Sequence, residues 1–391
     1  MTGVIASVMS VLSKTQIIGG AMRKIQFYLL CLTMMLFFST AFAEDTINIA
    51  AIYALTGEAA EDNAESLQGV RFGVEDINRQ GGVLGNKINL MIFDNHSSPI
   101  GSDIAARNAA KADVTCIIGA SWSTHSLAIA KVAQAHGIPM ISNISTHPDV
   151  TKTGDHIFRV CFTDAFQGTV MGRFARQDMN AASAVVFTKL TSDYSLMLSD
   201  IFRKNFEQSG GKILLELEYK SKQEKFDEQI IRAKNAGADV LFLSGHGESG
   251  FIARQAQDAG IRSVPLGGDG WSSQSFFTKG GSKLRRGYYC THWSEFTDSE
   301  ISRYFVKKYQ HSDNFSVSTV LGYDAVVLLA DAIRRAGSAD RGKIREALAN
   351  TRSFVGVTGS ITFDANGDPV KSAVIMEISD GKQRYFKTLK P

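Results

Sequence analysis

Short apolar runs alternate with segments of helical spacing along this chain of 391 residues. The alternating and then apolar run 46–57 predicts a strand, and apolar residues recur at helical spacing through 66–79. The run 88–95 predicts a second strand, and 104–111 predicts a second helix. Parallel strands need a crossover connection that is usually a helix, so this alternation predicts a doubly wound parallel sheet.

Two further strands are predicted to end in loops that are rich in hydroxyl groups. The runs 114–118 and 138–141 are short and apolar, as buried parallel strands are, and the segment 126–136 between them has helical spacing. Ligands of open α/β sheets bind beyond the carboxyl ends of the strands, where helix N-termini attract anions. The polar side chains after these strands either line an anion-binding site at this edge of the sheet or only cap helices. They are Ser121, Ser123, Thr124, Ser142, Asn143, Ser145 and Thr146.

The second half of the chain repeats this pattern. The runs 184–188 and 213–219 predict strands, and each is followed by a segment of helical spacing. An Ala-Asp-Val triplet, a Gly and a later Gly-Ile pair occur in one order from Ala112 to Ile138 and again from Ala238 to Ile261. The repeat predicts two lobes built on one plan, with convergence on generic βαβ spacing as the alternative.

Three extended runs without helical spacing separate these parts of the chain. They cover 156–164, 285–293 and 353–364, and we expect the chain to cross between the lobes near Cys161, Cys290 and Gly356. The predicted organisation is an upstream extension with a signal peptide at 1–43, lobe 1 from 44–160 plus 291–356, and lobe 2 from 161–290 plus 357–391.

The N-terminal segment predicts secretion. Arg23 and Lys24 follow Met22 and precede the apolar run 25–38, and small residues close the segment at Ala43. This order is typical of a signal peptide cleaved after Ala43, and the apolar run is shorter than the roughly 20 residues of a membrane-spanning helix. We therefore expect a periplasmic protein whose translation starts at Met22.

The charge balance argues against nucleic acid or an anionic membrane as a partner. The chain has 42 basic and 39 acidic residues, and removal of Lys14, Arg23 and Lys24 with the leader makes the two numbers equal. A neutral chain without a basic cluster has no electrostatic attraction to polyanions.

Three cysteines remain after the leader, in an oxidising compartment. Cys116 falls within a predicted buried strand, where an inert thiol is usual. Cys161 and Cys290 both fall in predicted crossings, so a disulfide between them is a hypothesis.

The chain resembles the type I periplasmic binding proteins, in particular the leucine/isoleucine/valine-binding protein of ABC transporters. The resemblance extends over 44–391 and rests on Leu-Thr-Gly after the first strand and on the segments 69–95, 117–124, 137–148 and 265–270. It implies an α/β protein with two Rossmann-like lobes joined by three crossing strands. It also implies capture of an amino acid or similar small carboxylate between the lobes and delivery to a membrane permease, with no cofactor, metal or catalysis.

The resemblance also assigns a binding site. Ser123 and Thr146 match the hydroxyls that hold the ligand carboxylate, while the Ile144 carbonyl and Asp269 match the partners of its amino group. The chemistry agrees, because hydroxyls suit a carboxylate and an acid suits an ammonium. Asp269 could instead be a turn residue that bonds its own backbone. Further expected ligand contacts are Thr124, Ser145, Tyr194, His246, Trp271 and Asp62, with ordinary packing as the alternative for Tyr194.

Two features depart from the branched-chain binders. Asp62 stands near the position of an aromatic residue, and a buried carboxylate there disfavours a purely aliphatic ligand. The disulfide of the closest relatives is missing, with Ser97 and Trp122 at the corresponding positions. Polar or basic ligands therefore become candidates.

Three other interpretations were weighed against this one. An enzyme is disfavoured, because the chain has no nucleophile elbow, no histidine pair at metal spacing and no phosphate loop. A ligand-sensing periplasmic receptor subunit remains an alternative function. Amides, urea and aromatic acids remain alternative ligands.

Overall fold

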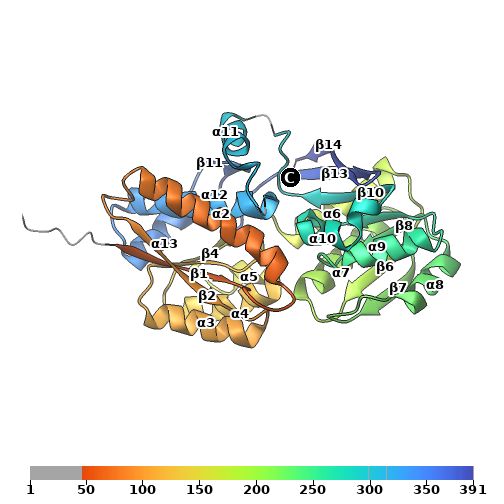
Figure 1. Ribbon diagram of the computed structural model, residues 1–391, viewed down its shortest axis with the longest axis horizontal. Helices are drawn as coiled ribbons and strands as arrows, with labels where there is room; N and C mark the ends of the chain where they lie inside the picture. Colours follow the sequence, from red (N-terminus) through yellow and green to blue (C-terminus); the bar gives the residue numbers. More distant parts are fainter. Residues whose placement is uncertain (1–45, 298, 314, 391) are drawn as a thin grey trace, which may run out of the picture. The chain divides into compact units, whose positions relative to one another are not determined.

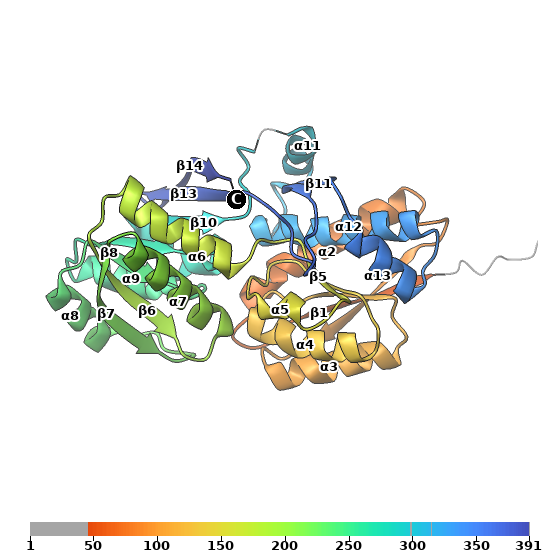
Figure 2. The ribbon, with the colours of Figure 1, turned by 180° about the vertical axis from the view of Figure 1, so that it is seen from behind.

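The computed structural model describes residues 46–390 except 298 and 314, and these residues form one compact unit. The predicted signal peptide and its cleavage site lie outside the described residues. Figures 1 and 2 show two sheets, each covered by helices on both faces. We refer to the first sheet with its helices as lobe 1 and to the second as lobe 2. Within the described part, no helix is long and apolar enough to cross a membrane.

Lobe 1 contains a five-stranded parallel sheet with the order β2-β1-β3-β4-β5. Alternate residues of β1 face opposite cores: Ile49 and Ala51 pack with α2 and α12, whereas Ala50 and Ile52 pack with α3 and α4. The elements of this lobe are β1 (Ile47–Tyr53), α2 (Ala60–Arg79), β2 (Ile88–Asp94), α3 (Pro99–Lys111), β3 (Cys116–Gly119), α4 (Ser123–Ala135), β4 (Met140–Ser142), α5 (Asp149–Lys152), β5 (Ile157–Arg159), α11 (Glu300–Tyr309), α12 (Val317–Ala336) and α13 (Arg341–Ala349).

Lobe 2 contains a seven-stranded sheet with the order β14-β13-β10-β9-β8-β6-β7. Its parallel part, β7-β6-β8-β9-β10, has the same order as the sheet of lobe 1, as the sequence repeat predicts. The elements are α6 (Asp164–Arg173) with a π-helical extension (Phe174–Asp178), β6 (Ser183–Lys189), α7 (Asp193–Gln208), β7 (Lys212–Tyr219), α8 (Asp227–Ala236), β8 (Val240–Leu243), α9 (Ser249–Asp258), β9 (Val264–Gly267), α10 (Gln274–Lys279), β10 (Arg286–Thr291), β13 (Ala373–Ser379) and β14 (Lys382–Leu389).

Several helices begin earlier than their apolar spacing predicts. Helix α2 starts at Ala60 rather than 66, and α3 starts at Pro99 rather than 104. The first turn of α2 carries Glu61 and Asp62, and α3 is capped by Ser98. Polar first turns favour helix N-termini but carry no apolar signal, so spacing alone misses them.

The third crossing differs from the prediction. The run 353–364 contains an antiparallel hairpin of β11 (Phe354–Gly356) and β12 (Gly359–Ile361). Val357, Ile361 and Phe363 pack in the core of lobe 1, whereas Ala373 packs in lobe 2. The chain therefore crosses after Phe363 rather than near Gly356. A hairpin and a single extended crossing have the same short, β-rich sequence pattern.

The hypothesis of a Cys161–Cys290 disulfide is wrong. Both residues and Cys116 are buried free thiols. Cys161 packs in the core of lobe 1, where Sγ donates to the Ser145 carbonyl at 3.3 Å, and Cys290 packs in a core of lobe 2. Two side chains that point into separate cores cannot meet at disulfide distance.

Helices α2 and α12 pack closely where each has a glycine. A Cβ atom added at Gly69 would lie 1.8 Å from the carbonyl oxygen of Thr319, and one added at Gly322 would lie 2.4 Å from that of Ser66. These contacts are with backbone atoms, which cannot rotate away. The spacing between the two helices therefore depends on the absence of side chains at these positions.

We expect Gly69→Ala to destabilise the protein by about 1–3 kcal/mol, because overpacking forces the backbone to shift. Intrinsic helix propensity acts in the opposite direction, since alanine is favoured over glycine by up to about 1 kcal/mol. Urea unfolding measures the difference. Gly342→Ala in α13 is the control, because this glycine is exposed. Equal or greater stability of the Gly69 variant would contradict the packing argument.

Candidate functional site

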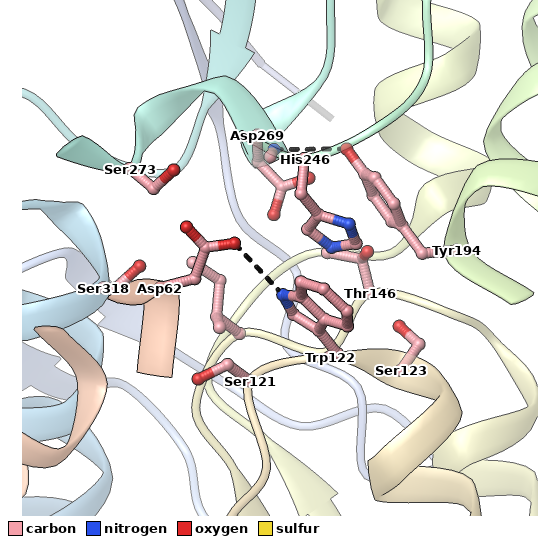
Figure 3. A pocket seen from close by; sticks show the side chains of 12 residues that line it. Asp62, Ser121, Trp122, Ser123, Thr146, Tyr194, His246, Asp269, Ser273 and Ser318 are labelled. Carbon is pink, nitrogen blue, oxygen red and sulfur yellow. Dashed lines mark hydrogen bonds between the residues drawn. The ribbon is translucent and has the colours of Figure 1, made fainter. Parts of the chain in front are cut away.

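A pocket lies where the carboxyl ends of the parallel strands of both lobes face each other (Figure 3). The empty space between its lining atoms amounts to about 390 Å³, its opening included. Lobe 1 contributes side chains from α2, α12 and the loops after β3 and β4, and lobe 2 contributes the segments after β6, β8 and β9. The lining residues are Asp62, Ser121, Trp122, Ser123, Ile144, Thr146, Tyr194, His246, Asp269, Gly270, Ser273 and Ser318.

One wall of the pocket lies at the N-terminus of α4. Ser123 is the first residue of this helix, and the preceding Trp122 provides no side-chain cap. Ser123 Oγ accepts a hydrogen bond from His147 N at 3.2 Å, so its own O–H can still donate. The Thr146 hydroxyl has no hydrogen bond of regular geometry within the described residues. It lies near Asp164, whose pKa burial raises to about 8 although Thr146 acts to lower it. Hydroxyl donors at a helix N-terminus suit an anionic group.

Buried hydrogen bonds hold the two loops of this wall in place. Ser145 Oγ donates to the carbonyl oxygens of Ala120 and Ser121, at 3.0 Å each, and so ties the loop after β4 to the loop after β3. The fully buried Arg159 donates to the carbonyl oxygens of Ser145 at 2.6 Å and His147 at 2.9 Å. Positioning by buried groups keeps the hydroxyl wall rigid.

Asp269 dominates the opposite wall. Its Oδ1 accepts from Gln167 Nε2, and its Oδ2 lies beside His292 Nε2, both at 2.9 Å. Burial by itself would raise the pKa of Asp269, but the hydrogen bond and charge of His292, with the bonds from Gln167 and Tyr194, leave that pKa lowered. The carboxylate is therefore charged although buried. Such a group suits an ammonium ion, which forms a strong charge-assisted hydrogen bond.

An aromatic stack joins the two walls. The ring of His246 lies between the rings of Trp122 and Tyr194, with centroid distances of 4.6 Å to each. Trp122 belongs to lobe 1, and the other two residues belong to lobe 2. His246 is 9% exposed, and its Nδ1 has no hydrogen-bond partner within the described residues. Burial lowers the pKa of His246, so the ring is held neutral.

Asp62 lies at the other end of the pocket, in the first turn of α2. It is 8% exposed, and its Oδ2 accepts from Trp122 Nε1 at 3.3 Å. Its Oδ1 has no hydrogen-bond partner within the described residues. Burial raises the pKa of Asp62, and the neighbouring His246 and Lys279, with a weak hydrogen bond from Ser273, oppose only part of the increase. In Figure 3, Asp62 lies on the same side as Ser273 and Ser318.

Seven of the ten predicted ligand contacts line the pocket: Asp62, Ser123, Ile144, Thr146, Tyr194, His246 and Asp269. Three do not. Ser145 holds the loops together, and Thr124 Oγ1 accepts from the backbone N–H of Asp193 in lobe 2 at 3.1 Å. Trp271 is fully buried behind the pocket, where it stacks on Phe276 and donates from Nε1 to the Leu243 carbonyl. The Trp271 side chain points away from the pocket because a turn of 3-10 helix begins at Asp269, two residues earlier.

The sequence analysis missed four lining residues and the partners of Asp269. Trp122 was noted only as the replacement for a cysteine, although it lies in the same hydroxyl-rich loop. Ser318 and Ser273 carried no sequence signal of binding, because they come from segments far from the first loops. Gly270 is the fourth. Gln167 and His292 reach Asp269 only through tertiary packing, and no local motif marks them.

This chain is similar to known proteins in sequence and fold over most of its length. Residues 46–383 match the periplasmic binding protein family. The Leu/Ile/Val-binding protein homolog 3 of Brucella melitensis is 28% identical over an alignment of 355 residues, and the alignment covers 88% of this chain and 94% of that protein. A leucine-binding protein of Thermotoga maritima is 33% identical with a TM-score of 0.84, over 88% of this chain and 99% of that one.

A second solved structure supports the same relationship. The branched-chain amino acid transporter substrate-binding protein of Streptococcus pneumoniae, solved in complex with isoleucine, is 28% identical with a TM-score of 0.84. The match covers 89% of this chain and 100% of that one. The expected α/β fold of two doubly wound lobes is thereby confirmed. The chain belongs to the periplasmic binding protein family.

Proposed function

We propose that this protein captures an α-amino acid between its lobes and delivers it to the membrane permease of an ABC transporter. The observation that carries the proposal is the placement of a hydroxyl wall with Ser123 and Thr146 opposite a charged carboxylate, Asp269. The ligand carboxylate would bind the hydroxyls and the N-terminus of α4, and its ammonium would bind Asp269 and the Ile144 carbonyl. The relatives named above support this assignment, because two are named as binding proteins for leucine or for leucine, isoleucine and valine, and the third was solved in complex with isoleucine.

The energies of these contacts are adequate for capture from dilute solution. Each charge-assisted hydrogen bond contributes about 1.5–3 kcal/mol, and micromolar binding needs about 8 kcal/mol. Three or four such bonds therefore suffice before the entropic cost of association is subtracted.

Closure of the lobes is part of the proposal. Lys189 Nζ of lobe 2 lies 2.6 Å from Glu58 Oε1 of lobe 1, and Gln274 N donates to Glu65 Oε1 at 2.7 Å. Ligand that touches both walls stabilises the closed arrangement by its differential affinity, and the permease would recognise that arrangement. Ligand release then requires only that the lobes separate.

We also propose that the protein acts in the periplasm without catalysing a reaction. The family assignment supports this location, and the segment 22–43 would supply the cleaved signal peptide. The first two lobe boundaries would be those expected from the sequence, after residues 160 and 290. The third would lie after Phe363 instead of after Gly356, because the 354–361 hairpin packs on lobe 1.

A thermal-shift screen of the twenty amino acids tests the proposal. At one hundred times its dissociation constant, a true ligand should stabilise the folded protein by about 2.7 kcal/mol. For each amino acid that binds, calorimetry with the matching amine and the matching deaminated acid should show at least tenfold weaker binding. The loss is expected because each analogue lacks one of the two charged ends. Failure of every amino acid to raise the melting temperature would reject the proposal.

A further inference from the structure

The end of the pocket opposite the hydroxyl wall carries an acid and hydroxyl groups. Asp62 shares this end with Ser273 and Ser318 (Figure 3), while the hydroxyl of the lining Ser121 donates to Ser66 at 2.8 Å. Figure 3 shows Asp62, Ser273 and Ser318 on one side and Ser123 with Thr146 on the other, with Trp122 between them. If the two ends of the zwitterion bind at Ser123, Thr146 and Asp269, the ligand side chain must extend toward Asp62. This step rests on the proposed function.

Two buried atoms at this end of the pocket have no hydrogen-bond partner within the described residues beyond a weak interaction between Ser273 and Asp62. Asp62 Oδ1 and Ser273 Oγ are both buried and have no hydrogen bond of regular geometry within the described residues. A buried carboxylate oxygen without a partner is costly, since it loses its hydration and gains nothing in return. An aliphatic ligand side chain would seal this oxygen from water and increase the cost.

The neighbouring cations are engaged elsewhere. Lys279 Nζ donates to Ser275 Oγ at 2.8 Å, and Lys189 Nζ lies 2.6 Å from Glu58. Among the described residues, no lysine or arginine lines the pocket. No cation in the described part of the chain therefore contacts Asp62 directly to favour its charged form, while the proposed amino-group partner, Asp269, is already held by His292 and Gln167.

We propose that the pocket selects an α-amino acid whose side chain ends in a nitrogen donor, either a cationic ammonium or guanidinium or a neutral amide, and that Asp62 is the residue that selects it. The donor gives Asp62 Oδ1 the hydrogen bond of regular geometry that it lacks among the described residues, and a cationic donor also favours the charged form of Asp62. The serine hydroxyls around it can accept or donate, so they accommodate the remaining hydrogens of the nitrogen group. Specificity of this kind is strong, because a ligand without the donor leaves a buried polar group unpaired.

Calorimetry with matched ligands tests this proposal on the wild-type protein. Lysine is compared with norleucine, ornithine with norvaline, and glutamine with leucine. At least one nitrogen-ended member should bind ten or more times as tightly as its aliphatic partner, and the identity of that member distinguishes a cation from an amide. Equal or tighter binding of the aliphatic members would overturn the selection while leaving the proposed function intact. If no nitrogen-ended amino acid binds, arginine and asparagine included, the selection fails, and the proposed function fails only if every amino acid of the thermal-shift screen also fails.

Variants of Asp62 provide the second test. Asp62→Asn should weaken binding of a cationic ligand at least tenfold, and Asp62→Leu should reverse the preference toward norleucine or leucine. Glu75→Gln is the matched control, because Glu75 is exposed on the same helix α2. Melting temperatures of the ligand-free proteins verify that the variants fold. If a variant does not fold, the calorimetry of matched ligands with the wild-type protein decides whether the pocket selects a nitrogen donor. An unchanged ligand order in both folded variants would refute the role of Asp62.

Discussion

Asp269→Asn is expected to weaken amino-acid binding by about 2–5 kcal/mol, or roughly thirtyfold to several thousandfold, because it removes one partner of a buried charge pair. The proposed partner of Asp269 is the ligand ammonium. Asparagine has nearly the same shape and can still hydrogen-bond to Gln167 and His292, so the pocket should keep its form. The charge alone is then changed, and calorimetry with the best ligand of the screen measures its effect.

The control for this variant is Asp258→Asn. Asp258 is an exposed acid at the end of α9, also in lobe 2, and forms a surface pair with Arg254. Its replacement should leave affinity unchanged, because exposed ion pairs contribute little. If Asp269→Asn folds normally and binds as tightly as the wild type, Asp269 is not the partner of the ammonium.

Trp271→Ala is expected to lower the free energy of unfolding by about 3–5 kcal/mol, because it leaves a large cavity in a packed core. The side chain is fully buried, stacks on Phe276 with a centroid distance of 4.4 Å and donates from Nε1 to the Leu243 carbonyl at 3.2 Å. Urea unfolding of the free protein measures the loss. The variant separates a core residue from a ligand contact, which the sequence alone could not do.

Trp271→Phe completes the experiment. Phenylalanine keeps an aromatic ring against Phe276 but cannot donate to Leu243, so a smaller loss of stability, of about 1 kcal/mol, is expected. Ligand affinity should stay within a factor of about three, because Trp271 does not line the pocket. A large loss of affinity with little loss of stability would instead place the indole in contact with the ligand.

Capture and selection use different parts of the pocket in this account. Ser123, Thr146 and Asp269 are proposed to bind the two charged ends that all α-amino acids share. Asp62 is proposed to select the side chain, which differs from one amino acid to the next. One fold can thus keep its capture chemistry and change its substrate by altering residues at the far end, since function depends on the site rather than on the fold.

Much of the fold could be predicted from the chain because its signals are local. Apolar runs and helical spacing predicted the alternating strands and helices of both lobes, and the repeat from Ala112 and from Ala238 predicted that the lobes share one plan, which their common strand order bears out. The 353–364 hairpin and the early start of α2 escaped prediction. A hairpin differs from a crossing only in what it packs against, and a polar first turn has no apolar period.

The binding site divides in the same way. Asp269 was assigned by the family resemblance, whereas position after a strand was enough to place Ser123 and Thr146 at one edge of the sheet, because carboxyl ends of parallel strands gather there. Such a position was insufficient for Trp271, whose direction depends on a turn of 3-10 helix, and for Ser318, which α12 brings from the far end of the chain.

The sequence by itself determined the two-lobed α/β architecture, the family resemblance and most of the residues at the strand ends. Only the tertiary structure decided that Cys161 and Cys290 point into separate cores, that Gln167 and His292 hold Asp269, and that Asp62 Oδ1 has no hydrogen bond of regular geometry within the described residues. The reason is physical: periodicity records which face of an element is buried, whereas hydrogen-bond partners and unpaired atoms depend on packing between segments far apart in the chain.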